Sequence, residues 1–263
     1  MNFFYALIYF YIFVFGLIVG SFLNCVIYRL ETGESFLKGR SFCPHCKHIL
    51  EWKDLIPILS FILLKGKCRY CGKKISFQYP IVEFLTGFLF FLISKFYFFP
   101  IIFQNFLTTI YLLLTTSFLI VIFFFDFKHY LIPDRVIYPA ILVSLTFLFL
   151  YPKSYILNPL CSAFGASLFF FFIYLISKGK WMGFGDVKLA FLIGLFLGFP
   201  KILVALFFAF FIGALIGIGL ILAKKKTLKS EVPFGPFLIT GAFLALFFGE
   251  NLIPWYLNFF LLK

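Results

Sequence analysis

The sequence predicts an all-α polytopic membrane protein of about eight transmembrane helices with a small cytoplasmic zinc-binding insert. Three observations predict this fold class: a very apolar composition, long unbroken apolar runs, and one polar segment that holds two Cys-x-x-Cys pairs. Of the 263 residues, 63% are hydrophobic and only 13% are charged, whereas about a quarter of a soluble chain is charged. A globule of this length still exposes much of its surface. The composition therefore indicates a chain whose main partner is the lipid bilayer.

The apolar runs predict the individual spans. They lie near residues 3–28, 80–99, 104–125, 136–151, 157–177, 187–199, 201–223 and 234–250. Helices are expected because lipid cannot satisfy free backbone groups, and the runs lack the alternation of barrel strands. The first run is longer than a signal-peptide core and follows no basic residue, so we interpret it as a retained span.

Three details of this assignment are expectations about packing. The run 187–199 is short for a span and needs shelter from its neighbours. Gly213, Gly217 and Gly219 should permit close helix contacts in the following span. A short apolar tail over 252–262, bounded by Pro254, is expected after the last span.

The positive charge predicts the orientation of the spans rather than a nucleic-acid partner. The net charge is +13, and ten of the 23 Lys and Arg lie in residues 29–80. Basic residues collect in cytoplasmic loops, and placing 29–80 inside also puts the loops 126–135, 178–186 and 224–231 there. The other side then keeps only Lys95, Lys153, Lys201 and Lys263. We expect three regions: a first helix (1–28), a cytoplasmic zinc-binding segment (29–79) and a membrane-embedded domain (80–263).

The polar segment carries the spacing of a metal site. Its two Cys-x-x-Cys pairs, Cys43 with Cys46 and Cys68 with Cys71, are separated by 21 residues, as in structural zinc sites with four thiolate ligands. Disulfides are disfavoured in the cytoplasm, although two reversible dithiols stay an alternative. A segment of about 50 residues holds little core, so a metal ion would stabilise it.

Two aspartates at predicted span ends are candidates for catalysis. Asp126 follows the run 118–125, and Asp186 closes Gly183-Phe184-Gly185-Asp186. Two carboxylates that share a low-dielectric site hold one proton between them, so one accepts a proton from water while the other polarises a carbonyl. The glycines could admit substrate or water. Each aspartate could instead be a helix N-cap, a role that suits Asp134 after Pro133. Glu83, Glu231 and Glu250 are the other acidic residues near membrane depth.

Several short motifs, in order along nearly the whole chain, together resemble one family. They are Gly20-Ser21-Phe22-Leu23-Asn24, Ile27-Tyr28-Arg29-Leu30, the two Cys-x-x-Cys pairs with Ile56-Pro57-Ile58-Leu59-Ser60 between them, Tyr79-Pro80-Ile81-Val82-Glu83, Asp126 with Ile132-Pro133-Asp134, Gly183-Phe184-Gly185-Asp186-Val187-Lys188-Leu189, and Pro233-Phe234-Gly235-Pro236. On these residues the chain resembles the type IV prepilin peptidases, or leader peptidase/N-methyltransferases, which are GxGD-type membrane aspartyl proteases.

The resemblance implies a bifunctional enzyme of the inner membrane with its active site facing the cytoplasm. It implies cleavage of the basic leader of prepilins or pseudopilins, typically after Gly, and then N-methylation of the new terminus, commonly Phe, by S-adenosylmethionine. The catalytic aspartates of the family map onto Asp126 and Asp186. Asp134 matches a recurrent family position that we interpret as supporting. The zinc-type segment is the part associated with methylation.

Two departures from the family pattern concern methylation more than proteolysis. Asp54-Leu55 stands where Asp-Asn is frequent, and Glu31 stands where Pro is common. No glycine-rich S-adenosylmethionine loop is recognisable. Asn24, Arg29 and Glu83 are candidates for binding this cofactor because they are polar residues at span ends near the zinc-type segment, although a role as topology anchors or caps stays open.

Two other classes of function compete with this prediction. A transporter or channel could use the carboxylates as an ion relay, and a membrane scaffold could use the zinc-type segment to bind a partner. Relays favour the midplane of the membrane, whereas Asp126 and Asp186 are predicted at span ends beside Lys128 and Lys188. The predicted depth therefore favours the peptidase.

Overall fold

The computed structural model describes residues 2–35, 39–100, 102–150, 156–224 and 232–261. Helices dominate this part of the chain, which contains no named strand and only two isolated bridges, Phe42 with Ile49 and Lys67 with Lys74. Glu231 falls outside the described residues. The chain divides into two compact units, Met1–Val121 and Ile122–Lys263.

The first unit is built on a pair of long helices. Helix α1 (Asn2–Thr32) packs along α3 (Gln78–Ile93), which continues into a short π-helical stretch, Ser94–Phe98. A Cβ on Gly20 would press against the Cα atom of Glu83, so glycine is what lets the two backbones approach.

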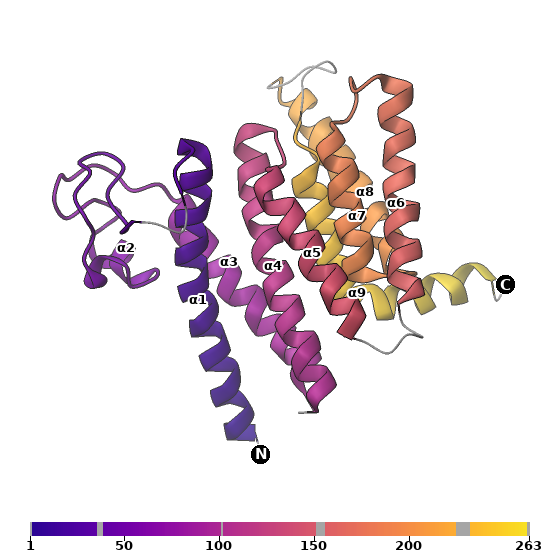
Figure 1. Ribbon diagram of the computed structural model, residues 1–263, viewed down its shortest axis with the longest axis horizontal. Coiled ribbons are helices and arrows are strands. Elements are labelled where there is room, and N and C mark those ends of the chain that lie inside the picture. The colour runs from indigo at the N-terminus through magenta and orange to yellow at the C-terminus, as the bar shows by residue number, and fades with distance from the viewer. Residues whose placement is uncertain (1, 36–38, 101, 151–155, 225–231, 262–263) are drawn as a thin grey trace. The chain divides into compact units, whose positions relative to one another are not determined.

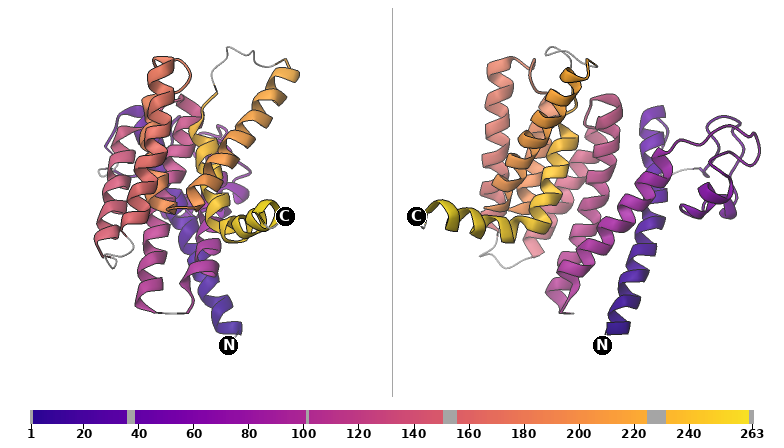
Figure 2. Two further views of the ribbon diagram at one scale, coloured as in Figure 1. Left: turned by 90° about the vertical axis from the view of Figure 1, so that its right-hand side faces the viewer. Right: turned by 180° about the vertical axis from the view of Figure 1, so that it is seen from behind.

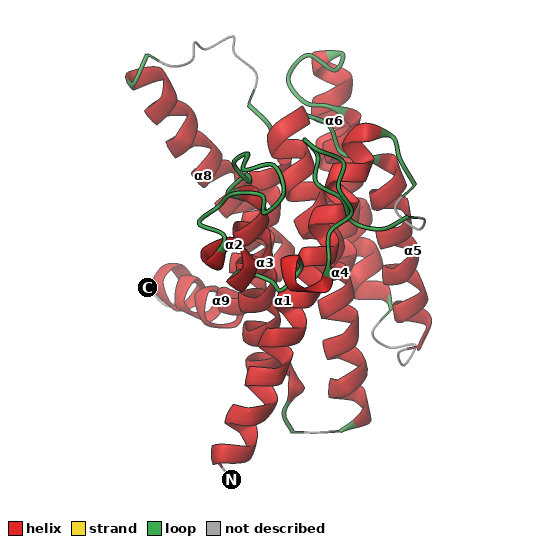
Figure 3. Cartoon of the chain, turned by 90° about the vertical axis from the view of Figure 1, so that its left-hand side faces the viewer, coloured by secondary structure: helices red, strands yellow, loops and turns green. Residues whose placement is uncertain are grey.

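The insert between these two helices is mostly loop, as Figure 3 shows. It contains a 3-10 turn, Trp52–Asp54, and the short helix α2, Leu59–Leu63.

The second unit is a helical bundle around a short central helix (Figure 1). It contains the end of α4 (Phe103–His129), followed by α5 (Asp134–Leu150), α6 (Leu157–Ser177), α7 (Phe184–Leu197), α8 (Lys201–Leu222) and α9 (Gly235–Leu261). Helix α7 contacts α5, α6, α8 and α9. Its buried residues run from Val187 to Phe196 and cover most of its circumference. A helix that is apolar all round is stable when it is surrounded, which confirms the shelter expected for 187–199.

Within the described residues, six helices are long and apolar enough to cross a membrane: α1, α3 with its π-helical extension, α4, α6, α8 and α9. The all-α prediction is confirmed for the described residues, whereas the predicted number of about eight spans is not. Helices α5 and α7 coincide with two of the predicted spans, but they have only 17 and 14 residues.

Two packing expectations were wrong. Helix α9 runs through Pro254 to Leu261 and changes direction on the way (Figure 2), so 252–262 is not a separate tail. A proline inside a helix removes one hydrogen bond and can bend the helix without ending it.

The other wrong expectation concerns the glycines of α8. A Cβ on Gly217 or Gly219 would meet no described atom outside its own helix backbone within 4 Å, and a Cβ on Gly213 would lie nearest to the Phe237 ring, at 3.2 Å. The close backbone contacts of this unit lie instead at Gly194, against α6, and at Gly241, against α8.

Candidate functional site

The first predicted aspartate, Asp126, lies three residues before the end of α4. Its side chain is only 4% exposed. The backbone N–H of Gly235, the first residue of α9, faces its carboxylate, and a Cβ on Gly235 would collide with Oδ2. Among the described residues, Oδ2 has no hydrogen-bond partner. An unpartnered buried carboxylate oxygen is costly in a purely structural role. This oxygen is therefore available to accept a hydrogen bond from a water molecule or a substrate.

The second aspartate, Asp186, lies in the first turn of α7. The turn begins at Gly183, whose backbone is extended and whose carbonyl accepts the N–H of Asp186 at 3.2 Å. The N–H of Gly183 in turn faces the Asp186 carboxylate. This carboxylate lies close enough to Asp126 for the two charges to interact. Both residues belong to the second compact unit, which brings together groups 60 positions apart in the sequence.

The two glycines of the Gly-x-Gly-Asp motif have different surroundings. A Cβ on Gly183 would lie 3.9 Å from Oδ2 of Asp186, whereas a Cβ on Gly185 would lie 3.1 Å from Cβ of Ile132. Gly183 therefore lies beside the carboxylate. Gly185 allows α7 to pack against the segment that precedes Pro133.

Asp134 lies outside this pair. It is the first residue of α5, and the carbonyl of Pro133 before it accepts the N–H groups of Val136 and Ile137. Asp134 accepts a hydrogen bond from Nζ of Lys188 on α7 at 2.5 Å. This ion pair joins α5 to α7, two residues beyond Asp186. The Lys188 ammonium also lies over the rings of Tyr138 and Phe184, at 5.0 and 5.4 Å.

Neither Asp126 nor Asp186 caps a helix as a simple structural aspartate would. Asp126 is near the C-terminal end of its helix, and the extended cap of α7 is Gly183 rather than Asp186. Gly235, whose N–H faces Asp126, has no role that the sequence predicts. Its only signal was the Pro-Phe-Gly-Pro motif, which does not indicate that this glycine faces Asp126.

The first unit holds a second candidate site, at the cysteine pairs. The Sγ atoms of Cys43, Cys46, Cys68 and Cys71 all lie within 4.8 Å of one another. Tetrahedral zinc with Zn–S bonds of 2.3 Å requires sulfur atoms about 3.8 Å apart, and Sγ of Cys43 lies 4.0 Å from Sγ of Cys71. The four side chains therefore fit a tetrahedral metal ion after small adjustments.

The two cysteine turns have the same backbone design. Cys43 N–H donates to the His48 carbonyl, as Cys68 N–H does to that of Lys73, and each turn is closed by an N–H bond back to its first cysteine. The residue after the second cysteine has positive φ in both turns, at Lys47 and Gly72. Burial opposes ionisation of Cys43, but hydrogen bonds from the backbone N–H groups of Cys46 and His45, together with those from the Cys46 and Cys68 thiols, outweigh burial and lower the pKa of Cys43 to about 7. A low thiol pKa favours the thiolate that metals require.

A carboxylate outside the metal site accepts hydrogen bonds from the second cysteine turn. Asp54, whose side chain is 4% exposed, accepts hydrogen bonds from Nε of Arg69 at 2.8 Å and from the Tyr70 hydroxyl at 2.9 Å. Partial burial opposes ionisation of Asp54, but these two bonds and the N–H of Glu51 lower its pKa. Burial of the Tyr70 hydroxyl and its hydrogen bond to Asp54 raise the pKa of this hydroxyl to about 12. The Tyr70 ring also contacts His48 in the first turn, with 3.7 Å between the ring centres.

The three residues proposed to bind the cofactor separate into two groups. The buried Arg29 donates to the carbonyls of Ser35, Gly39 and Arg40. Arg29 therefore anchors the start of the zinc-type segment.

Glu83 and Asn24 form a different arrangement at the interface of α1 and α3. Glu83 Oε2 accepts the N–H of Ile58 at 2.7 Å, and the Ser21 side chain also contacts this carboxylate. Asn24 donates to the Tyr79 carbonyl, while its buried Oδ1 has no partner among the described residues. Ile58 has φ +61°, which is rare and strained for a β-branched residue.

Two family models match the chain. The Bacterial Peptidase A24 N-terminal domain matches residues 14–97, and the Type IV leader peptidase family matches residues 113–218. No match to a solved structure was found.

Among the curated relatives are three proteins with the same name, "Prepilin leader peptidase/N-methyltransferase". The Bacillus subtilis protein is 34% identical over 259 residues, which cover 94% of this chain and 97% of the relative. The Aeromonas hydrophila protein is 31% identical, with 95% and 94% covered, and the Legionella pneumophila protein is 30% identical, with 94% of each covered. The chain therefore belongs to the type IV leader peptidase family, to which its motifs and its aspartate pair had already pointed.

Proposed function

We propose that this protein cleaves the leader from prepilin-type substrates with Asp126 and Asp186, and methylates the new N-terminus in its first compact unit. The relatives named above are prepilin leader peptidases with methyltransferase activity. The observation that carries the peptidase assignment is the meeting of two carboxylates, each facing the N–H of a glycine. Among the described residues, no basic side chain forms an ion pair with either carboxylate.

The mechanism follows from one proton shared by the two carboxylates. The ionised carboxylate takes a proton from a water molecule, and the water oxygen bonds to the carbonyl carbon of the scissile peptide. The protonated carboxylate gives its proton to the carbonyl oxygen. When the C–N bond breaks, the carboxylate that took the water proton passes it to the leaving amine nitrogen, and one hydroxyl of the gem-diol gives its proton to the other carboxylate as the product carbonyl forms, so the pair again holds one proton. The Gly183 and Gly235 amides orient the two carboxylates throughout.

We propose that the end of the bundle that carries the two aspartates faces the cytoplasm. In the second unit α4, α6 and α8 end there, while α5, α7 and α9 begin there. Its basic residues include Lys128, Arg135, Lys178 and Lys180, as expected for a cytoplasmic face. Helices α5 and α7 would complete a set of eight spans, with α7 short because protein rather than lipid surrounds it.

We assign methyl transfer to the first unit, at Glu83 and Asn24. S-adenosylmethionine, when bound, supplies the methyl group and carries positive charge on its sulfonium and amino groups. Glu83 offers a buried negative charge and Asn24 an unpartnered acceptor, and buried polar atoms without partners are rare unless they have a function. The Ile58 N–H donates a hydrogen bond to the Glu83 carboxylate. Because the backbone of Ile58 is strained, we infer that the loop around Ile58 moves away from Glu83 when the cofactor binds. We propose zinc as the metal of the four cysteines, where it would hold the two cysteine turns together.

The peptidase assignment is tested by cleavage of a prepilin with a Gly–Phe junction, with the enzyme in nanodiscs. Asp186→Asn should abolish cleavage while the protein stays folded. The matched control is Glu250→Gln, which removes a carboxylate of the same unit that pairs with Lys201 at 2.8 Å and should leave cleavage unchanged. Wild-type cleavage by Asp186→Asn would refute the aspartate pair. No cleavage by folded wild type across several prepilins would favour a transporter or scaffold.

The cofactor assignment is tested by direct binding, separately from activity. Glu83→Gln should weaken binding of S-adenosylmethionine, measured by calorimetry, by at least about tenfold, because a buried charge partner of a cation is worth more than 1.4 kcal/mol. Glu34→Gln, at an exposed position beyond the end of α1, is the control. Equal affinity of the two variants would place the cofactor elsewhere.

A further inference from the structure

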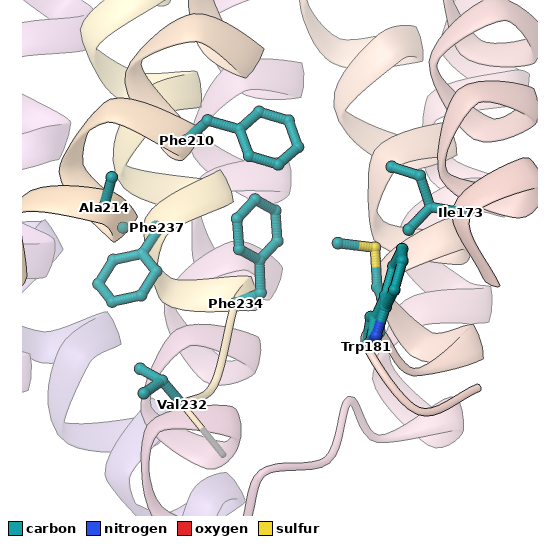
Figure 4. A pocket seen from close by; sticks show the side chains of 9 residues that line it. Ile173, Trp181, Phe210, Ala214, Val232, Phe234 and Phe237 are labelled. Carbon is teal, nitrogen blue, oxygen red and sulfur yellow. The ribbon is translucent and has the colours of Figure 1, made fainter. Parts of the chain in front are cut away.

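A cavity of about 410 Å³ lies in the second unit between α6 and α8, at the end that carries the two aspartates. One wall is formed by Ile173 of α6 with Trp181 and Met182 from the loop that follows it. The facing wall comes from α8 and the start of α9, where Figure 4 shows Phe210, Ala214, Phe234 and Phe237. Its volume is typical of ligand sites, which usually measure about 300–1,000 Å³.

Both walls of this cavity are continuous with the aspartate pair. Met182 immediately precedes Gly183, whose N–H faces Asp186. Phe234 immediately precedes Gly235, whose N–H faces Asp126. A substrate bond held between the two carboxylates would therefore leave one of its flanking segments at the mouth of the cavity.

The lining selects for apolar chemistry. Every lining residue in the part of the chain that the structure describes is apolar or glycine, and none of them is charged. The Phe210 and Phe234 rings lie 5.1 Å apart, and both also contact Phe170, at 6.1 and 5.9 Å, so this wall is a packed aromatic cluster rather than a set of loose side chains. Trp181 on the opposite wall is 76% exposed. A charged segment would lose its hydration here without gaining a partner.

We propose that this cavity binds the apolar side chains of the substrate next to the scissile bond, and so fixes the bond between Asp126 and Asp186. The inference rests on the proposed peptidase function and adds a specificity site to it. It assigns the apolar flank of the substrate to the α6–α8 side of the pair and excludes a basic leader from that side. A lipid acyl chain would also suit an apolar lining, but it would not require that the lining residues Met182 and Phe234 adjoin the two glycines that face the carboxylates.

The first test measures how the cavity discriminates between substrates. Ala214→Trp should fill the cavity from α8 and raise the KM for prepilin cleavage by at least about tenfold, with a smaller effect on kcat, because it blocks binding rather than proton transfer. The control is Leu215→Trp, on the same helix at an exposed position that does not line the cavity. A prepilin whose large apolar residues beside the scissile bond are replaced with Ser should give more similar KM values for Ala214→Trp and wild type. The reason is that both changes remove the same contact between substrate and cavity.

The second test needs no catalysis. A prepilin that carries a benzoylphenylalanine photoprobe beside its scissile bond is irradiated with the Asp186→Asn protein, and the adducts are mapped by mass spectrometry. Adducts on Trp181, Met182 or Phe210 are expected, and Ala214→Trp should remove them. If wild type cleaves the substrate, three results would overturn the specificity site. These are adducts on other residues, adducts with lipid only, and a wild-type KM for Ala214→Trp. Failure of wild type to cleave any prepilin would instead overturn the proposed function.

Discussion

In each compact unit one helix carries a deeply buried carboxylate, Glu83 on α3 and Asp126 on α4, and the two carboxylates differ in their surroundings. Glu83 in the first unit is 7% exposed and Asp126 in the second is 4% exposed. Glu83 is held by the Ile58 N–H at 2.7 Å, and no other carboxylate is found among its contacts in the described residues. Asp126 keeps one oxygen without a partner and lies near a second carboxylate. A single buried carboxylate suits the binding of a cation, whereas a pair suits the transfer of a proton.

The largest expected effect is that substitutions of Asp126 and Glu83 remove different activities. Asp126→Asn should reduce prepilin cleavage by on the order of 10⁴-fold, because the pair can no longer pass a proton in both directions, while a pre-cleaved N-terminal peptide is still methylated. Glu83→Gln should leave cleavage and abolish methylation. Mass spectrometry of the substrate N-terminus reads both reactions. If each substitution removed both activities, the two carboxylates would belong to one site and the comparison would fail.

A smaller effect is expected from changing the glycine that faces Asp126. Gly235→Ala places a Cβ against Oδ2 of Asp126, and the carboxylate must turn away. A displacement of about 1 Å at a catalytic group costs on the order of 10²-fold in rate, which a cleavage assay will show as a lower kcat. Gly217→Ala is the control, because no atom lies within 4 Å of the new Cβ, and this helical substitution should be neutral or slightly stabilising. Full activity of Gly235→Ala would show that the orientation of Asp126 does not matter.

The metal site should affect the first unit more than the second. Cys68→Ser should release zinc, measured as a fall from about one ion per chain, and should weaken methylation by about tenfold or more, since loss of a supporting site commonly costs 10- to 100-fold. Prepilin cleavage should change less. Cys161→Ser in α6, away from the cluster, is the control. Unchanged zinc content in Cys68→Ser would exclude the four-cysteine site.

The smallest expected effect is a dependence of the insert on pH through Asp54. The folded-state pKa of Asp54 is lowered by Arg69 and Tyr70, so its contribution to stability is present above the unfolded pKa of about 3.9 and is lost as the pH falls through the lower folded value. Asp54→Asn should therefore increase hydrogen exchange over residues 41–75 at pH 7, and the difference from wild type should shrink as the pH approaches 3. An equal difference in hydrogen exchange between Asp54→Asn and wild type at both pH values would show that packing rather than the charge of Asp54 stabilises its contact with Arg69 and Tyr70.

Much of the architecture could be predicted from local sequence. Long apolar runs predict membrane helices because the backbone must satisfy itself in lipid, and six such helices are present. Two Cys-x-x-Cys pairs predict a metal site because each pair needs only one tight turn, and the four thiols do lie together. The glycines next to Asp186 indicated an unusual helix start, and Gly183 forms an extended cap there.

What the sequence alone determined about this protein is therefore its class, its metal-type insert and the identity of its two aspartates as candidates. The tertiary structure alone decided which groups meet: Gly235 with Asp126, Lys188 with Asp134, Ile58 with Glu83, and the loops on either side of the aromatic cavity. The physical reason is sequence distance. A turn or a helix is specified by neighbouring residues, whereas these contacts join segments 25 to 109 positions apart and depend on how several helices pack at once.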